Sequence, residues 1–155
     1  METSARRLAF AEQVALAKWD TGTPVEDAAR EVQVIASATK AGESRGLDEA
    51  VVSNFFRSQI EANKLVQYSL LAEWRRVVKA PDHAPVDLAG TIRPELEPLG
   101  TELIAELTET ADIRANRSCR TDIAKAVGKY VSAHKNKFTP LKLVPLDRAM
   151  AATCV

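Results

Sequence analysis

Acidic and basic residues balance in this chain of 155 residues, with 21 of each. This balance argues against a protein that acts mainly on nucleic acid or an anionic membrane, because such partners are bound by a surplus of positive charge, although a local basic patch stays open. Hydrophobic residues make up 46% of the chain, which suits a single folded domain over residues 1–155. The sequence contains no run of about 18 apolar residues, so it predicts no membrane-spanning helix.

The first part of the chain predicts two helices. Residues 3–19 carry apolar side chains at helical spacing. The turn DTGTP follows, and Thr23 is the expected N-cap of a second helix. This second helix is expected to run to about Thr39 and to stop before Gly42, with a short loop after it.

The longest uninterrupted stretch is residues 47–79, which contains no Pro and no Gly. It predicts one helix about 50 Å long, at about 1.5 Å per residue, with Asp48 as its N-cap. Its apolar residues recur at helical steps and form a broad stripe, made up of Val52, Phe55, Phe56, Ile60, Leu65, Val66, Leu70 and Trp74. We expect the rest of the chain to be arranged around this helix.

The second half predicts a connector and three further helices. Pro81 and Pro85 keep residues 80–90 from being helical. With no strand pattern anywhere, the predicted fold class is all-α, a bundle of about six helices around one long central helix, in which residues 5–79 and 91–155 belong to one domain. The elements predicted after the connector are a helix over residues 91–112 that starts securely at about Glu95, a break over 113–117, a helix over 118–134, a polar link over 135–137 and a last helix over 139–153.

The only two cysteines, Cys119 and Cys154, stand far apart in the chain. Neither belongs to a CxxC motif, and the only histidines are His83 and His134, so no structural zinc site is expected. Two buried thiols are the simplest interpretation, and a disulfide that holds the last helix in an oxidising compartment is the alternative. The first ten residues, METSARRLAF, lack the apolar core of about 7–15 residues that marks a signal peptide, so we expect any export signal to have been removed already.

Two cations share one stripe of the first predicted helix. Eleven residues at about 100° each bring Lys18 to within about 20° of Arg7, on the same side as Ala11 and Val14. Taken alone, this pattern is explained by long cationic side chains that extend from the edge of an apolar face.

The second helix carries a comparable polar face. Asp27, Arg30, Glu31 and Val34 stand at positions i, i+3, i+4 and i+7 and therefore point the same way. Taken alone, this face is explained by a surface ion pair between Asp27 and Arg30, worth a few tenths of a kcal/mol.

Two uncharged amides, Asn63 and Gln67, lie one turn apart within the apolar stripe of the long helix. A buried amide without a partner destabilises a protein by roughly 1–3 kcal/mol, so each needs a hydrogen bond. Taken alone, the pair is explained by amides that bond each other or solvent.

Together, these faces predict a bundle interior that holds the three cations Arg7, Lys18 and Arg30 beside two amides. Cations in a largely apolar cavity need anions, and Asp27 and Glu31 are too few to balance them. A small dianionic ligand would supply the rest. The sequence offers no Ser–His or Cys–His arrangement, no Gly-rich phosphate loop and no cluster of metal ligands, so a reaction here would need no nucleophile.

The residues on these faces also form a pattern that is known from one protein family. The spacings that lead from Arg7 through Lys18, Asp27, Arg30, Glu31 and Asn63 to Gln67 are 11, 9, 3, 1, 32 and 4 residues, and they match the pattern of that family without a gap. The GLD before the long helix and the QIxAxKxxQ of residues 59–67 are similar to the secreted, or gamma, class, and the detailed resemblance covers about residues 5–76. The chain resembles the all-helical chorismate mutases of type II at Arg7, Lys18, Asp27, Arg30, Glu31, Leu47, Asp48, Asn63 and Gln67.

The resemblance implies a pericyclic Claisen rearrangement of chorismate to prephenate, with no cofactor and no covalent intermediate. Catalysis would hold the dicarboxylate substrate in a compact conformer and stabilise the charge that builds on its ether oxygen. Arg7 would bind a carboxylate, Lys18 would contact a carboxylate and the ether oxygen, and Gln67 would donate to that same oxygen. Glu31 would accept a hydrogen bond from the substrate hydroxyl.

The same resemblance implies supporting roles. Asp27 would support the neighbouring acid or the lysine, Arg30 would line the carboxylate end, and Val34 would be a wall. Asn63 stands where family members carry a small hydroxyl residue, which leaves its role open. One more arginine is expected from the same chain after the connector, with Arg93 in DLAGTIR as the candidate and Arg75, Arg76 and Arg114 as alternatives.

The resemblance further implies a disulfide between Cys119 and Cys154, a secreted or periplasmic location and a homodimer. Two alternative functions stay open. A non-catalytic helical domain for a small dicarboxylate would bind chorismate saturably without forming prephenate. A structural or partner-binding bundle would leave the cations Arg7, Lys18 and Arg30 exposed to solvent.

Overall fold

The computed structural model describes residues 1–134 and 139–155, so the polar link predicted over residues 135–137 lies outside the described part. All regular secondary structure in that part is helical, with no strand, which confirms the predicted all-α class. The observed elements are α1 (Glu2–Ala9), α2 (Ala11–Thr21), α3 (Ala28–Glu43), α4 (Glu49–Val77), the π-helix η1 (Leu88–Ile92), α5 (Arg93–Glu109), α6 (Ala111–Arg114), α7 (Cys119–Ala133) and α8 (Pro140–Met150). The described elements fit a bundle of about six helices around one long helix, with the first predicted helix divided in two and two short elements, η1 and α6, added.

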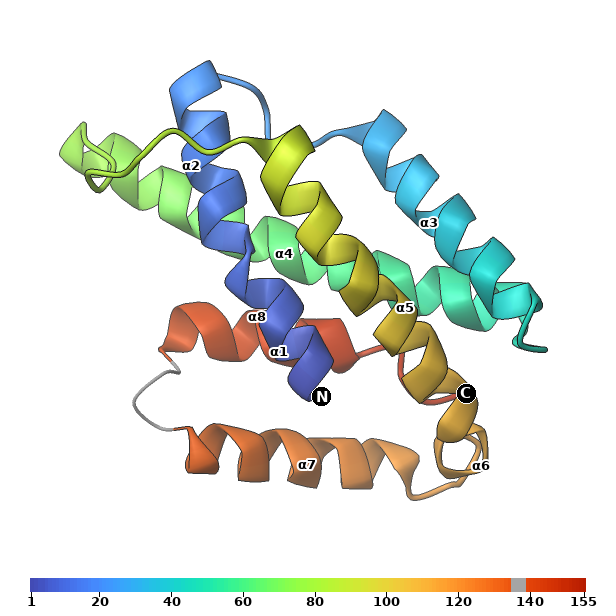
Figure 1. Ribbon diagram of the computed structural model, residues 1–155. Coiled ribbons are helices and arrows are strands. Elements are labelled where there is room, and N and C mark those ends of the chain that lie inside the picture. The colour runs from blue at the N-terminus through green and yellow to red at the C-terminus, as the bar shows by residue number, and fades with distance from the viewer. Residues whose placement is uncertain (135–138) are drawn as a thin grey trace.

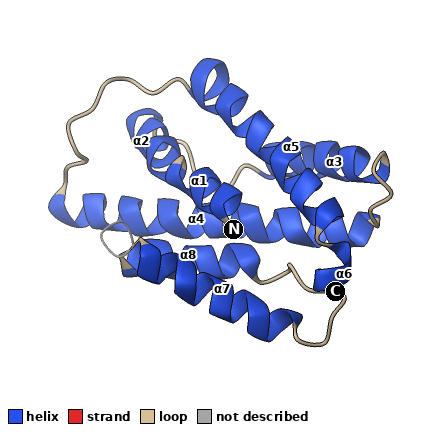
Figure 2. Ribbon diagram, turned by 60° about the horizontal axis from the view of Figure 1, so that its bottom comes forward, coloured by secondary structure: helices blue, strands red, loops and turns tan. Residues whose placement is uncertain are grey.

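Helix α4 is the spine of the fold, and α2, α3 and α8 all pack against it. In Figure 1, α2, α3 and α5 lie on one side of α4, and α8 followed by α7 lies on the other. Figure 2 shows the long loop that leads from the C-terminal end of α4 back to α5. The predicted cap of α4 is confirmed, since the Asp48 carboxylate accepts N–H hydrogen bonds from Ala50 (2.8 Å) and Val51 (3.1 Å).

The first predicted helix is in fact two helices, and the prediction of one continuous helix was wrong. At Phe10 the backbone N–H bonds to the carbonyl of Arg7, three residues back, at 3.3 Å. This tighter bond ends α1, and the Phe10 carbonyl then accepts from the N–H of Val14 as α2 begins. Arg7 and Lys18 therefore belong to different helices.

Helix α3 begins four residues later than predicted, because its N-cap is Asp27 and not Thr23. The Asp27 carboxylate accepts the N–H of Arg30 at 3.1 Å. The helix also continues through Gly42, which was wrongly expected to lie beyond its end. Gly42 is buried, and a Cβ at this position would stand 2.6 Å from Cγ2 of Val52, so glycine allows α3 and α4 to approach closely.

The helix predicted to start at about Glu95 begins earlier, because η1 continues directly into α5. Asp87 caps η1 by accepting N–H hydrogen bonds from Ala89 (3.0 Å) and Gly90 (2.9 Å). Pro94 does not interrupt α5, since a proline in the first turn removes no intrahelical hydrogen bond. The connector is therefore helical at its end.

The C-terminal helices follow the prediction with smaller shifts. The break expected over residues 113–117 begins at Thr110, which leaves the helical conformation (φ −102°, ψ 13°), and α6 fills part of the break. Helix α8 contains Pro145 and ends at Met150, three residues before the predicted end at residue 153.

A disulfide joins Cys119, at the start of α7, to Cys154 in the C-terminal tail. The bond implied by the resemblance is thereby confirmed, and the interpretation as two free thiols is wrong. The tail is also held to α6, because the N–H of Val155 donates to the carbonyl of Arg114 at 3.1 Å.

Two buried apolar clusters lie along α4. One joins α3, α4 and α5 around Phe55 and Phe56, and the other joins α2 to the C-terminal part of α4, where the rings of Trp19 and Trp74 meet edge to face at 6.0 Å. On α4, the polar positions 63 and 67 fall between these clusters. The packing of the bundle therefore surrounds the polar positions from which the site is built.

Candidate active site

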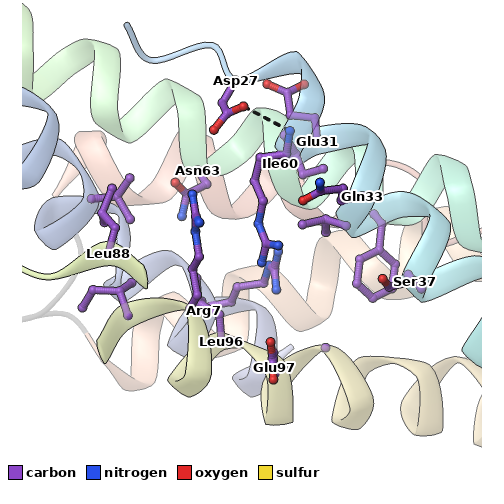
Figure 3. A pocket seen from close by; sticks show the side chains of 18 of the residues that line it. Arg7, Asp27, Glu31, Gln33, Ser37, Ile60, Asn63, Leu88, Leu96 and Glu97 are labelled. Carbon is purple, nitrogen blue, oxygen red and sulfur yellow. Dashed lines mark hydrogen bonds between the residues drawn. The ribbon is translucent and has the colours of Figure 1, made fainter. Parts of the chain in front are cut away.

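One cavity of about 420 Å³ lies between α1, α2, α3, α4, η1 and α5. Figure 3 shows it from close by, with Glu97 of α5 on the wall opposite Gln33 of α3. The alternative arginines, Arg75, Arg76 and Arg114, are not among the described residues that line it. The cavity brings together every predicted site residue, namely Arg7, Lys18, Asp27, Arg30, Glu31, Val34, Asn63, Gln67 and Arg93.

Arg7 enters the cavity from α1, and its guanidinium carbon lies 5.9 Å from the centre of the Phe56 ring. No carboxylate of the described residues lies within ion-pair distance of it. Burial, and after it the charge of Arg30, lowers the pKa of Arg7 to about 10. Arg7 is thus a cation that the protein itself leaves largely uncompensated, which suits a site for an anion.

Lys18 of α2 donates a hydrogen bond to the carbonyl of Val25, in the turn that leads to α3. Burial lowers the pKa of Lys18, while the negative charges of Asp27 and Glu31 act in the opposite direction. These two acids therefore offset part of the effect that burial has on the pKa of Lys18.

The acids on α3 differ in their contacts. Asp27 bonds the backbone N–H of Arg30, so the surface ion pair between these side chains is not what the structure shows. The carboxylate of Glu31 lies 3.3 Å from the ammonium nitrogen of Lys64 on α4. Asp27 therefore has a structural role as the cap of α3 in addition to its charge beside Lys18.

The two amides of α4 bond each other inside the cavity. Gln67 is 4% exposed, and its Nε2 donates to Oδ1 of Asn63 at 2.6 Å. The amide–amide bond confirms the simpler interpretation of this pair, and the same two side chains nevertheless line the cavity. Since Nε2 carries two hydrogens, one N–H of Gln67 remains for a ligand.

Sequence reasoning missed several polar residues of the cavity wall. Lys64 stands three residues before Gln67, so helical periodicity could have placed it on the same face. Glu97 stands one turn after Arg93 and could have been found in the same way once that arginine was chosen. Gln33 and Ser37 lie along α3 on the same wall, and no charge or motif distinguishes them in the sequence.

Two further features of the described residues bear on the kind of site. They contain no group of three or more His, Cys, Asp or Glu side chains that could hold a metal ion. None of the helices in the described ranges is both long enough and apolar enough to cross a membrane.

Comparisons with known proteins point to one family. A family model described as chorismate mutase type II matches residues 1–68. A secreted chorismate mutase from Mycolicibacterium smegmatis is 29% identical over 155 residues, which cover 99% of this chain and 83% of that protein.

Two solved structures also resemble nearly the whole chain. The crystal structure of chorismate mutase from Burkholderia phymatum superposes with a TM-score of 0.92 at 43% identity, covering 99% of this chain and 92% of that one. The crystal structure of chorismate mutase from Burkholderia thailandensis gives a TM-score of 0.92 at 31% identity, covering 99% and 95%. The chain belongs to the chorismate mutase family.

Proposed function

We infer that this chain is a chorismate mutase that rearranges chorismate to prephenate. This inference rests on one cavity, which is lined by cations from four helices other than α4 and by the buried amide of Gln67 on α4. The rearrangement breaks an ether C–O bond and forms a C–C bond within one molecule, so no atom is gained or lost. A cavity that only holds a conformer and stabilises charge is sufficient for such a reaction.

In this proposal, the cations bind the two carboxylates of the substrate. Arg7 grips one carboxylate with its planar guanidinium, and Arg30 and Arg93 line the carboxylate end. The lowered pKa of Arg7 supports this assignment, because a buried cation without a partner gains most from an anionic ligand. Binding in this way selects the compact conformer in which the reacting carbons are close.

The ether oxygen of the substrate accepts hydrogen bonds from two donors on different helices. Lys18 contacts it together with a carboxylate, and Gln67 donates its free N–H to it. A preorganised donor at developing charge of this kind contributes on the order of 10²–10³ in rate. Glu31 accepts from the substrate hydroxyl.

Three residues support this arrangement. Asp27 supports Lys18 through its negative charge. Asn63 orients Gln67 through the bond between their amides. Val34 forms part of the apolar wall.

The proposal extends to organisation and location. Residues 1–155 form one domain, with the catalytic helices in residues 5–79 and the helices of 91–155 completing the bundle. Export to the periplasm or the medium is supported by the disulfide, since such bonds persist in oxidising compartments, and by the M. smegmatis relative, which is named as secreted. We also propose a homodimer, in which each chain supplies the nine proposed site residues of its own cavity. Light scattering on the purified protein tests the dimer.

The direct test mixes the purified protein with chorismate and follows the loss of chorismate absorbance together with the formation of prephenate. We expect saturable turnover, and we expect Arg7→Ala to lose it while keeping the helical circular dichroism spectrum. Saturable binding of chorismate without prephenate would identify the non-catalytic binding domain instead. An absence of both turnover and binding would favour a structural bundle.

A further inference from the structure

Lys64 lines the cavity but has no role in the proposed reaction so far. Its side chain is only 12% exposed, and its ammonium nitrogen lies 3.0 Å from Glu61, 3.3 Å from Glu31 and 3.6 Å from Glu26. Glu61 and Glu26 are on the outer side of this group, with 44% and 70% of their side chains exposed, whereas Glu31 is 27% exposed and lines the cavity. Lys64 therefore links two exposed acids at the edge of the cavity to Glu31, which lines the cavity.

Lys64 stays protonated and positively charged. Burial by itself lowers the pKa of this lysine, but the hydrogen bonds to Glu61 and Glu31 and the negative charges of these acids together raise the pKa by more, so the net pKa lies above the ordinary value. Lys64 is thus an ammonium ion throughout the pH range in which enzymes are studied.

Glu31 interacts with two ammonium groups. Lys64 contacts it directly from α4, and Lys18 on α2 is close enough for its pKa to be raised by the negative charge of Glu31. Without Lys64, the remaining lysine would be the natural partner of Glu31. A direct Glu31–Lys18 pair would take both groups away from the substrate.

We propose that Lys64 is a positioning residue that holds the Glu31 carboxylate toward the substrate hydroxyl and away from Lys18. The inference rests on the proposed function, because it assumes that Glu31 and Lys18 both contact chorismate. Glu61 and Glu26 hold the ammonium group of Lys64 in place, and Lys64 in turn holds Glu31.

The test compares Lys64→Met with Lys64→Arg and with Lys40→Met, a lysine on the exposed side of α3 that does not line the cavity. We expect Lys64→Met to lower kcat/KM by about 10- to 100-fold, the range for a misplaced contact group. Lys64→Arg should recover most of the activity, and Lys40→Met should keep all of it. Should Lys64→Met not fold, Lys64→Gln removes the charge with a side chain that still donates.

Two further readouts test the proposal, and the first of them separates the positioning of Glu31 from the simple loss of a charge. In a Glu31→Gln background, Lys64→Met should have little further effect on kcat/KM, because no carboxylate remains to be held. The alkaline limb of the pH–rate profile should also move to higher pH in Lys64→Met. The reason is that the pKa of Lys18 rises when a neighbouring cation is lost and Glu31 comes closer, the other charges around Lys18 being Asp27 and Arg93.

Equal losses from Lys64→Met in both backgrounds, or an unmoved alkaline limb, would overturn the inference while leaving the mutase assignment intact. Failure of the unmodified protein to form prephenate would instead overturn the proposed function itself.

Discussion

Gln67 gives one amide hydrogen to Asn63, at 2.6 Å, while its own carbonyl oxygen is buried without a hydrogen-bond partner among the described residues. An unpaired buried acceptor destabilises the folded protein by roughly 1–3 kcal/mol, so this amide is not there for stability. The bond to Asn63 limits the rotation of the amide group and leaves the second hydrogen of Nε2 unused. A neutral donor held in this way is suited to an ether oxygen that becomes negative.

The first prediction concerns the charge state of that donor. Because the Gln67 amide does not titrate, activity should not collapse between pH 5 and pH 8. In Gln67→Glu the new carboxyl can donate only when protonated, and the cations Arg7 and Lys18 favour its ionised form. The rate of this variant should therefore fall as pH rises, by up to about tenfold per pH unit above the pKa of the new side chain.

The measurement is kcat/KM from pH 5 to pH 8 for both proteins and for Gln67→Leu. The leucine variant should be slower by about 10²–10³ at every pH, since it has no donor in any state. A flat profile for Gln67→Glu would place Gln67 away from the ether oxygen.

The second prediction uses the double role of Asp27. Asn caps a helix as well as Asp does, so Asp27→Asn keeps the start of α3 and removes only the charge. Asp27 raises the pKa of Lys18, and without that charge burial lowers the pKa further. Since Lys18 acts as a cation, activity is lost as pH rises through its pKa. The alkaline limb of kcat/KM should therefore move to lower pH, with little change at pH 7.

The matched control for Asp27→Asn is Asp48→Asn, which alters the cap of α4 in the same way outside the cavity. Its alkaline limb should coincide with that of the unmodified protein. Coincident limbs for all three proteins would show that Asp27 does not act on Lys18.

The third prediction separates function from stability at Arg7. A cation whose pKa is lowered by folding destabilises the folded state wherever it is charged, and this includes neutral pH. Arg7→Met keeps an unbranched side chain over Phe56 and removes the charge. Urea unfolding at pH 7 should give a stability that is unchanged or higher by about 1–2 kcal/mol, while kcat/KM falls by on the order of 10²–10³.

A dicarboxylate transition-state analogue provides the check on Arg7. At 100 times its Kd it should stabilise the unmodified protein by about 2.7 kcal/mol and Arg7→Met far less. A large loss of stability in Arg7→Met without ligand would mean that Arg7 serves the fold and not the site.

The sequence predicted best what one helix determines by itself. Arg30, Glu31 and Val34 share a face because three and four residues make about one turn, and that relation holds in any fold. The long helix and its Asp48 cap followed from the absence of breakers. Arg93 required the resemblance, because its place in the cavity depends on how the connector returns to the bundle.

The errors arose where tertiary packing overrides local signals. A glycine near a helix end predicts a stop, yet Gly42 is helical because Val52 needs the space that a Cβ would fill. At the break, the N–H of Phe10 bonds to the carbonyl of Arg7 instead of to the carbonyl one residue further back. No residue type in the sequence marks this change. Thr23 and Asp27 were both acceptable caps, and only the fold shows which one is used.

The fourth prediction concerns the disulfide, which joins residues 35 positions apart. Closing a loop of that size stabilises the folded state by roughly 3–4 kcal/mol through the entropy of the unfolded chain. Replacing both Cys119 and Cys154 with Ser should lower the free energy of unfolding by about this amount in urea titrations. Activity at 25 °C should nevertheless persist, because no residue of α7 or α8 in the described part lines the cavity.

A thiol assay should find no free thiol in the unfolded, non-reduced protein and two after reduction. Two free thiols before reduction, or a double variant as stable as the unmodified protein, would show that the tail is held by packing and by the Val155–Arg114 hydrogen bond alone.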